Sequence, residues 1–259
     1  GNGTVTSTVG TGSPSARIEG PYHNGWYRCS LTYTTASTQN YINIQLGVAQ
    51  NGTTVSYAGD GSSSIAVWGI QHEVSGHMTS YIPTVGAFAT RGRDIANISG
   101  EELTDFYNPV ESTIVVDYTH LNGATIATMG TNNRPYRFRA TSGADTRIDY
   151  VSTAAFHPYI AKDGGAVASL SHGSNPVLDG GVNRSAVRVK KDSFAVSTNG
   201  SAISGSAQDT SGAWPPTNPI DELNIGGNGS SGGTLIGHIR RFMYYRVGLP
   251  NSQLVTLTS

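Results

Sequence analysis

Cysteine is nearly absent from this chain of 259 residues, which carries only Cys29. A single thiol excludes an internal disulfide, and the Cys and His spacing of a structural zinc site does not occur either. The surrounding segment WYRCSLTYT, residues 26–34, has the composition of a strand. We therefore expect Cys29 to be a buried or half-buried thiol, which is the usual environment of a free cysteine.

Charge is sparse as well, with 17 acidic and 16 basic residues and a formal net charge of −1. The densest basic clusters, Lys190-Lys191 and Arg240-Arg241, are too short to neutralise a phosphate backbone, so nucleic acid is excluded as a partner. No apolar run approaches the roughly 18 residues that a membrane span needs. We therefore expect no membrane insertion.

Glycine, with 33 residues, and the small polar residues Ser, Thr and Asn are abundant instead. Between them lie short segments rich in Val, Ile, Thr and aromatic residues, several of which alternate with period two and so predict strands. Turn pairs such as Asp163-Gly164 and Asn199-Gly200 separate these segments. This pattern predicts an all-β fold of the sandwich or jelly-roll type. The predicted strands are residues 26–34, 41–48, 64–72, 112–119, 136–140, 185–190, 193–198 and 223–227.

The predicted strands fall into two antiparallel β-sandwich or jelly-roll units in tandem. Residues 84–98 contain glycines and no long period-two run, so they are interpreted as an extended connector between units 1–90 and 91–259. Fewer strands precede the connector than the roughly eight of a jelly roll, and residues 1–20 resemble strand material without a partner. We expect upstream strands or a neighbouring chain to complete the first unit. A start at Gly1, without a visible signal peptide, favours a piece processed or cut from a longer protein.

Two short helices are also predicted. Residues 99–107 open with Ser99 and have Glu102 three residues later, which is the arrangement of a capping box. Residues 249–258 carry Pro250 and Asn251 before the apolar pair Leu254 and Leu257, which are three residues apart, and this predicts one terminal turn that packs onto the sandwich.

The first unit carries a set of motifs in a particular order. NGWYRCSLTYT (24–34) is followed by DGSSSIAVWGIQHEVSGHMTSYIPT (60–84) and ATRGRDI (89–95). This order resembles a domain found in many phage tail-fibre and head-spike proteins, in which more strands usually precede the first motif. The sequence Gln71-His72-Glu73 stands where that family often has glutamine-leucine-glutamate. The resemblance implies a virion protein whose first unit is N-terminally incomplete.

The second unit resembles the laminin-G-like, or concanavalin-A-like, sandwich. The segments that carry the resemblance are STIVVDYT, the hairpin SAVRVKKDSFAVSTNGS, LNIGG and GHIRRFMYYRVGLPNSQLVTLT. In that fold a strand ending in a glycine pair leads into a penultimate strand and a final turn that contains leucine. The resemblance spans about residues 100–259 and implies the fold more strongly than any ligand.

No catalytic arrangement is evident. Glycoside hydrolysis needs two carboxylates about 5 to 9.5 Å apart across a cleft. Asp145 and Asp149 are four residues apart, but Arg147 lies between them on the same strand face, which predicts an ion-pair rung instead. No nucleophile elbow and no His-x-x-x-His spacing occur. We expect no metal and no cofactor, because a calcium-binding loop motif is also absent, although such sandwiches sometimes bind calcium through dispersed loop oxygens.

Aromatic residues offer a binding function. An aromatic ring edged by polar groups grips the C–H face of a sugar. Trp26 and Trp68 lie in predicted strands, so we expect both to fill a core. Trp214 lies instead in DTSGAWPPTNP, a proline-rich loop that begins at Asp209. Two interpretations of Trp214 stay open: a ligand-stacking plate beside Asp209, or a cap on the end of the sandwich.

A second aromatic loop is predicted over AAFHPYIAKDGG, where His157 and Tyr159 are candidate ligand-binding residues. Here too, plain loop packing is the alternative. Together these features predict a non-enzymatic virion fibre or spike protein that attaches to a bacterial surface polysaccharide and associates with other virion proteins. We expect a homo-oligomer, a trimer by resemblance, because repetition of weak sugar sites lengthens residence. A ligand-free structural component of the virion and a polysaccharide depolymerase are the alternatives.

Overall fold

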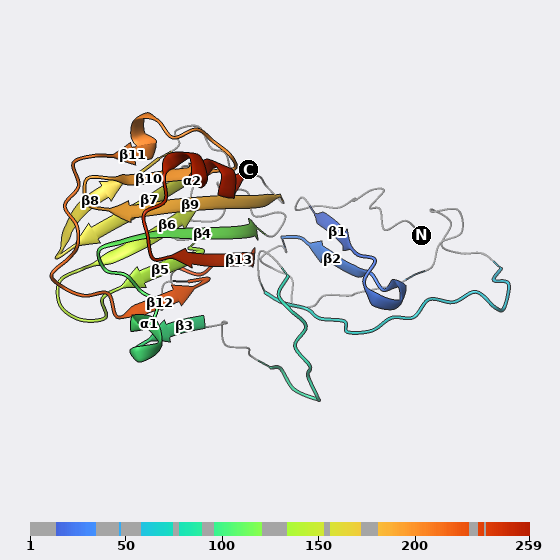
Figure 1. Ribbon diagram of the computed structural model, residues 1–259. Helices are drawn as coiled ribbons and strands as arrows, with labels where there is room; N and C mark the ends of the chain where they lie inside the picture. The colour runs from blue at the N-terminus through green and yellow to red at the C-terminus, as the bar shows by residue number, and fades with distance from the viewer. Residues whose placement is uncertain are drawn as a thin grey trace. The chain divides into compact units, whose positions relative to one another are not determined.

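The computed structural model divides the chain into two units, Gly1–Arg91 and Gly92–Ser259 (Figure 1). It describes residues 14–34, 47, 58–74, 78–89, 96–120, 134–152, 156–171, 181–227, 233–235 and 237–259, with the side chains of residues 150–157 left out. The division between Arg91 and Gly92 lies within the segment 84–98 in which the connector is predicted.

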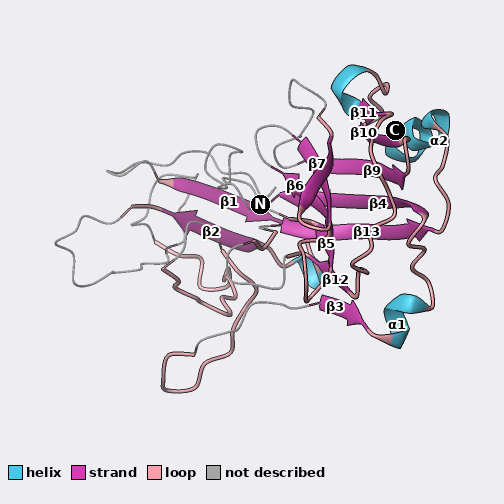
Figure 2. Ribbon diagram, turned by 90° about the vertical axis from the view of Figure 1, so that its left-hand side faces the viewer, coloured by secondary structure: helices cyan, strands magenta, loops and turns pink. Residues whose placement is uncertain are grey.

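The second unit is a sandwich of two antiparallel sheets. The five-stranded sheet has the order β11-β10-β9-β4-β13, and its strands β9, β4 and β13 lie side by side in Figure 2. Its strands are β4 (Glu111–His120), β9 (Val182–Lys190), β10 (Phe194–Thr198), β11 (Gln208–Asp209) and β13 (Gly237–Tyr245). The all-β fold class is confirmed.

The six-stranded sheet has the order β3-β12-β5-β6-β7-β8. Its strands are β3 (Ala96–Ser99), β5 (Tyr136–Arg139), β6 (Arg147–Ser152), β7 (Phe156–Lys162), β8 (Gly165–Ser169) and β12 (Glu222–Ile225). Strands β4, β5, β9, β10 and β12 coincide with strands predicted from the sequence. Strands β3, β6, β7 and β8 had not been predicted, because their runs are short or mix charged residues with apolar ones.

Period-two alternation builds the core between the sheets. Along β4 and β9, Ile114, Val116 and Val187 point inward, and they meet Phe138 and Ile148 of the six-stranded sheet in one buried cluster. Successive side chains of a strand point to opposite faces, so the residues between these apolar ones point outward. The two outer faces therefore differ in what covers them.

Helix α2 (Asn251–Thr258) covers the outer face of the five-stranded sheet. Its Leu254 is fully buried with Val115 and Ala186, and the Thr258 hydroxyl lies 2.8 Å from Ser197 Oγ. The terminal helical turn predicted over residues 249–258 is thus confirmed. The other helix, α1 (Glu101–Thr104), is a single turn within residues 99–107, but its N-cap is Gly100 and no side-chain capping bond from Ser99 forms.

The first unit contains one described sheet, in which β1 (Ser15–Glu19) pairs with β2 (Arg28–Thr32), linked through the 3-10 turn η1 (His23–Gly25). Residues 64–72 are described and form no strand, so the strand predicted there is wrong. The segment 41–48, also predicted as a strand, lies outside the described residues. The carboxylate of Glu73 accepts hydrogen bonds from the Thr79 N–H and hydroxyl, which fixes a loop in place of a strand pair.

Three buried positions predicted for the first unit are wrong. Cys29 is exposed, Trp26 is 44 % exposed and Trp68 is 71 % exposed. Trp68 contacts only one aromatic ring among the described residues, that of Tyr81, at 4.6 Å between centroids. Cys29 lies in β2, and no second described sheet covers the β1–β2 pair, so its side chain has no opposing layer in which to be buried. Trp26 and Trp68 lie outside the described strands of this unit.

Candidate functional site

A continuous row of polar side chains crosses the outer face of the six-stranded sheet. The strand register aligns one residue from each strand, and each residue is directly opposite the next. Residues directly opposite one another share a face, so all six side chains project from the side that faces away from the core. We call these residues the polar row: Asn97, Asn224, Arg137, Asp149, Tyr159 and Ser169.

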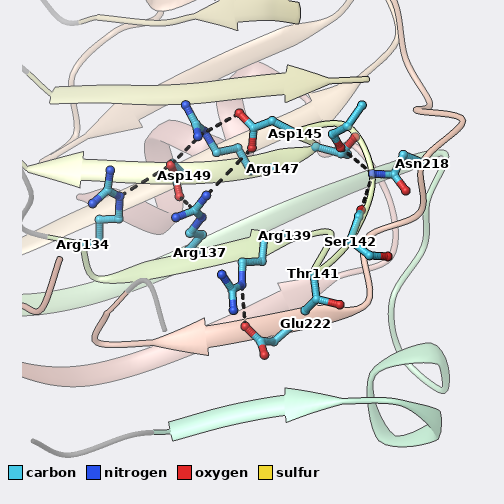
Figure 3. A network of polar contacts seen from close by, with 12 residues as sticks. Arg134, Arg137, Arg139, Thr141, Ser142, Asp145, Arg147, Asp149, Asn218 and Glu222 are labelled. Carbon is cyan, nitrogen blue, oxygen red and sulfur yellow. Dashed lines mark hydrogen bonds and ion pairs between the residues drawn. The ribbon is translucent and has the colours of Figure 1, made fainter. Parts of the chain in front are cut away.

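Asp149 is the centre of this face, although it is only 1 % exposed. Its carboxylate oxygens lie 3.2 Å from Arg137 Nε, 3.2 Å from Arg147 Nε and 3.5 Å from Arg134 Nε. Arg147 also reaches Asp145, with 2.9 Å between Nη1 and Oδ2, while Arg137 Nη2 lies 4.0 Å from the other Asp145 oxygen. Figure 3 shows these five residues, which we call the Asp149 network, converging from β5, β6 and the adjoining loops.

Burial and the neighbouring charges shift the pKa of Asp149, and that of Arg137, in opposite directions. Desolvation raises the pKa of Asp149, and the guanidinium groups of Arg137, Arg134 and Arg147 oppose that rise. Burial likewise lowers the pKa of Arg137, against the attraction of Asp149. Neither Arg137 Nε nor Arg147 Nε is aligned with Asp149 well enough to be a hydrogen bond, although both are ion-paired with it. The network is therefore held by charge and is not saturated by hydrogen bonds.

A second cross-strand row runs beside the first and contains another ion pair. Arg139 Nε lies 2.6 Å from Glu222 Oε1, and Asn224 Nδ2 donates to the same oxygen at 2.6 Å. Desolvation would raise the pKa of Glu222, but the hydrogen bonds from Arg139 and Asn224 lower it overall. The Arg139–Glu222 pair is balanced in charge, whereas the Asp149 network contains three guanidinium groups and two carboxylates.

Two loops border this face at one end. Asp221 accepts hydrogen bonds from the N–H and hydroxyl of Thr141, and Asn218 Nδ2 donates to the carbonyl of Ser142 at 2.9 Å. Asp163 accepts from the backbone N–H groups of Asn218, at 2.8 Å, and Thr217, at 3.2 Å. These bonds tie the β5–β6 and β7–β8 turns to the segment before β12, and they fix the rim of the face.

The rim predicts a pH effect at Asp163. The two backbone N–H donors lower the pKa of Asp163 below its ordinary 3.8. A carboxylate with a depressed folded-state pKa stabilises the fold above the unfolded pKa, and that contribution is lost as the pH falls through the folded value. Asp163→Asn, which suits the φ of 50° at this position, should unfold at lower urea than the wild type at pH 7. The difference in urea midpoint should shrink below pH 4; an unchanged difference would contradict the assignment.

Trp214 does not form the exposed plate that was one of its two predicted roles. It is 3 % exposed and packs edge-on against Phe194, with 6.4 Å between ring centroids. The same Phe194 ring also lies against Gly212, where a Cβ would come within 2.5 Å of it. Trp214 therefore seals the sandwich interior, as the alternative interpretation predicted, and offers no face to a ligand.

The other three candidate residues do not meet Trp214 in one site. Asp209 lies in β11 at the edge of the five-stranded sheet, where its Oδ1 accepts from the Ser211 N–H and hydroxyl. His157 and Tyr159 are in strand β7, not in the loop predicted there. The backbone of His157 pairs with Val151, and its side chain lies outside the description. Only Tyr159, half-buried under the Arg147 guanidinium at 4.8 Å, belongs to the polar face.

The acid pair tested from the sequence is confirmed as an ion-pair rung. Arg147 forms ion pairs with Asp145 at 2.9 Å and with Asp149 at 3.2 Å, so the two carboxylates do not face each other across a cleft. Among the described residues, no cluster of three or more His, Cys, Asp or Glu side chains could hold a metal ion. No helix of the described part of the chain is long and apolar enough to cross a bilayer.

Comparison with known proteins finds likeness only among solved structures. No family model and no curated protein matches the chain. A carbohydrate-binding module, CBM40, of a Ruminococcus gnavus IT-sialidase is 18 % identical over 59 % of this chain and 84 % of that one, with a TM-score of 0.43. The same module bound to α2,3-sialyllactose is 17 % identical over 64 % and 97 %, with a TM-score of 0.44. Trypanosoma rangeli sialidase is 16 % identical over 58 % and 22 %, with a TM-score of 0.42.

Sequence reasoning missed most of the polar face. Only the Asp145–Arg147–Asp149 spacing revealed part of it, because that rung lies along one strand. The alternation of Arg137 and Arg139 with Tyr136 and Phe138 was a second available signal, since it places both arginines on one face. Asn97 and Asn224 join the row only through strand order, which sequence periodicity does not reveal.

Proposed function

We propose that the second unit is a non-enzymatic carbohydrate-binding module whose site is the outer face of the six-stranded sheet. The observation that carries the proposal is the polar row, which extends across every strand of that sheet while the opposite face forms the core. Helix α2 covers the outer face of the other sheet, so the two outer faces are not equivalent.

The chemistry of the polar row matches that of a sugar. A sugar presents hydroxyl groups that donate and accept hydrogen bonds, and it needs partners of both kinds at close spacing. The row supplies an exposed amide at Asn97, a guanidinium at Arg137 and hydroxyls at Tyr159 and Ser169, whereas the Asn224 amide is buried and donates to Glu222. Strand backbones and ion pairs hold these groups before a ligand arrives, which lowers the ordering cost of binding.

We further propose that the chain belongs to a virion fibre or spike that attaches a phage to a bacterial surface polysaccharide. The motifs in residues 24–34, 60–84 and 89–95 support this role through their resemblance to phage fibre and spike proteins. Large exposed apolar side chains in the first unit, among them Trp26, Leu31 and Trp68, support association with further copies or other virion proteins. Repeated weak sites then act together.

The test is binding of the intact protein to an array of bacterial capsular and lipopolysaccharide glycans. We expect binding that Tyr159→Ala weakens about tenfold or more, because the ring and its stacked guanidinium lie on the face. Asn97→Ala, at the exposed end of the row, should weaken it by a smaller factor and keeps the test valid if Tyr159→Ala unfolds. The matched control is Arg184→Ala on the outer face of the five-stranded sheet, which should bind like the wild type.

Three results would contradict parts of this proposal. An intact, folded protein that binds no glycan would favour a purely structural virion component. Release of reducing ends from a bound polysaccharide would establish a depolymerase. Sedimentation of the intact protein should give the mass of a trimer. The mass of a monomer would contradict the proposed homo-oligomer.

A further inference from the structure

The Asp149 network contains one carboxylate that differs from the others in its exposure. Asp149 is buried beneath the guanidinium groups, whereas the Asp145 side chain is 46 % exposed at the rim. Both carboxylates contact the same two arginines, Arg137 and Arg147. The inner carboxylate thus fixes the guanidinium groups in place, and the outer one occupies donors that face solvent.

The outer donors of these arginines suit an anion. A guanidinium has five N–H donors in a rigid fork and binds a carboxylate with two of them. The Arg147 guanidinium lies over the Tyr159 ring, 4.8 Å from its centroid, and the Arg147 side chain is 28 % exposed. The Asp149 network contains three guanidinium groups and two carboxylates, so within it one positive charge is in excess. An anionic group at the Asp145 position would therefore be oriented by Arg147 and balanced in charge.

We infer that this face selects an acidic glycan, and that a sugar carboxylate binds Arg147 and Arg137 at the place now taken by the Asp145 carboxylate. The inference rests on the proposed carbohydrate-binding function and adds the class of sugar. Asp145 then acts as an internal competitor, which the glycan carboxylate displaces. If the network had a purely structural role, Asp145 would not compete with a ligand, and removing its carboxylate would not strengthen binding.

The experiment compares matched acidic and neutral glycans on the intact protein. The probes are polygalacturonate before and after reduction of its carboxyl groups, 3′-sialyllactose beside lactose, and dextran sulfate beside dextran. We expect the carboxylated probes to bind more tightly than their neutral counterparts and to weaken as salt is added, because salt screens exposed charges. Arg147→Gln should weaken binding of the carboxylated probes roughly 10- to 100-fold, the loss expected for a hydrogen bond to a charged group, and weaken binding of their neutral counterparts by a smaller factor.

Asp145→Ala is the discriminating variant. Removing an exposed competing carboxylate should strengthen binding of the carboxylated probes about two- to fivefold, whereas Arg184→Ala on the other sheet should not change it. Equal binding of reduced and unreduced polygalacturonate, or weaker binding by Asp145→Ala, would overturn the inference while the carbohydrate-binding function stands. Tight binding of dextran sulfate without binding of the carboxylated probes would contradict the assignment of a carboxylate as the group that the arginines bind. Absence of binding to any glycan would instead refute the proposed function itself.

Discussion

Asp149→Ala should destabilise the second unit by about 3 to 5 kcal/mol, the cost of removing one partner from a buried ion pair. The substitution leaves Arg134, Arg137 and Arg147 without the carboxylate that they share, while their side chains stay largely covered. Like charges held close together in a poorly hydrated place repel strongly. We expect a lower urea midpoint with an unchanged slope, since the surface exposed on unfolding stays nearly the same.

Two variants separate this effect from general damage to the face. Asp145→Ala removes an exposed carboxylate of the same network and should cost only about 0 to 1 kcal/mol. Asp149→Asn keeps the shape of the side chain and loses the charge, so its loss should fall between those of the two alanine variants. If Asp149→Ala costs no more than Asp145→Ala, the three guanidinium groups are hydrated in solution and the network is not buried.

Trp214→Ala should destabilise the second unit by about 3 to 5 kcal/mol, the range for removing a large aromatic side chain from a core. The indole is 3 % exposed and packs edge-on against Phe194, so its removal leaves a cavity in the core. The unfolding temperature should fall by several degrees, because about 1 kcal/mol shifts the midpoint of a domain of this size by about 2 to 4 °C. Calorimetry of the intact protein measures this.

The same variant tests the role of Trp214 in binding. Glycan affinity measured well below the unfolding temperature should match that of the wild type, because the ring faces the interior. Trp214→Phe should lose less stability, and the Trp214→Ala, Phe194→Ala double variant should lose less than the sum of the single ones, since the two rings touch. A variant that keeps its unfolding temperature and loses glycan affinity would restore the exposed-plate interpretation.

The sequence predicted the fold of the second unit better than that of the first. Strands with strong alternation, such as the one that became β4, were found because their apolar residues recur at every second position. Residues 64–72 are also rich in branched and aromatic residues and yet form no strand, because composition reports a preference for a sheet and does not supply the neighbouring strand. The exposure of Trp68 has the same cause.

The candidate site was predictable only where it follows a single strand. The Arg147 rung needed nothing beyond the alternation of one chain segment. The rest of the polar row joins residues from strands far apart in the sequence, such as Asn97 and Asn224, and strand order is set by the whole fold. Trp214 was ambiguous for another reason: a proline-rich loop can present its aromatic ring to solvent or turn it inward, and only the folded structure shows that this ring packs against Phe194.

The charged layer over β5 and β6 has a consequence for how the chain avoids misfolding. A slip of one residue between these strands would reverse the faces of one of them, which would carry either Arg137 or Asp149 into the apolar interior and turn Phe138 or Ile148 outward. A mispaired hairpin would therefore be destabilised in two ways, because it would bury an unpaired charge and expose an apolar side chain to water. The outward-facing charges thereby favour the native register of β5 and β6 during folding, independently of any ligand that they bind in the folded protein.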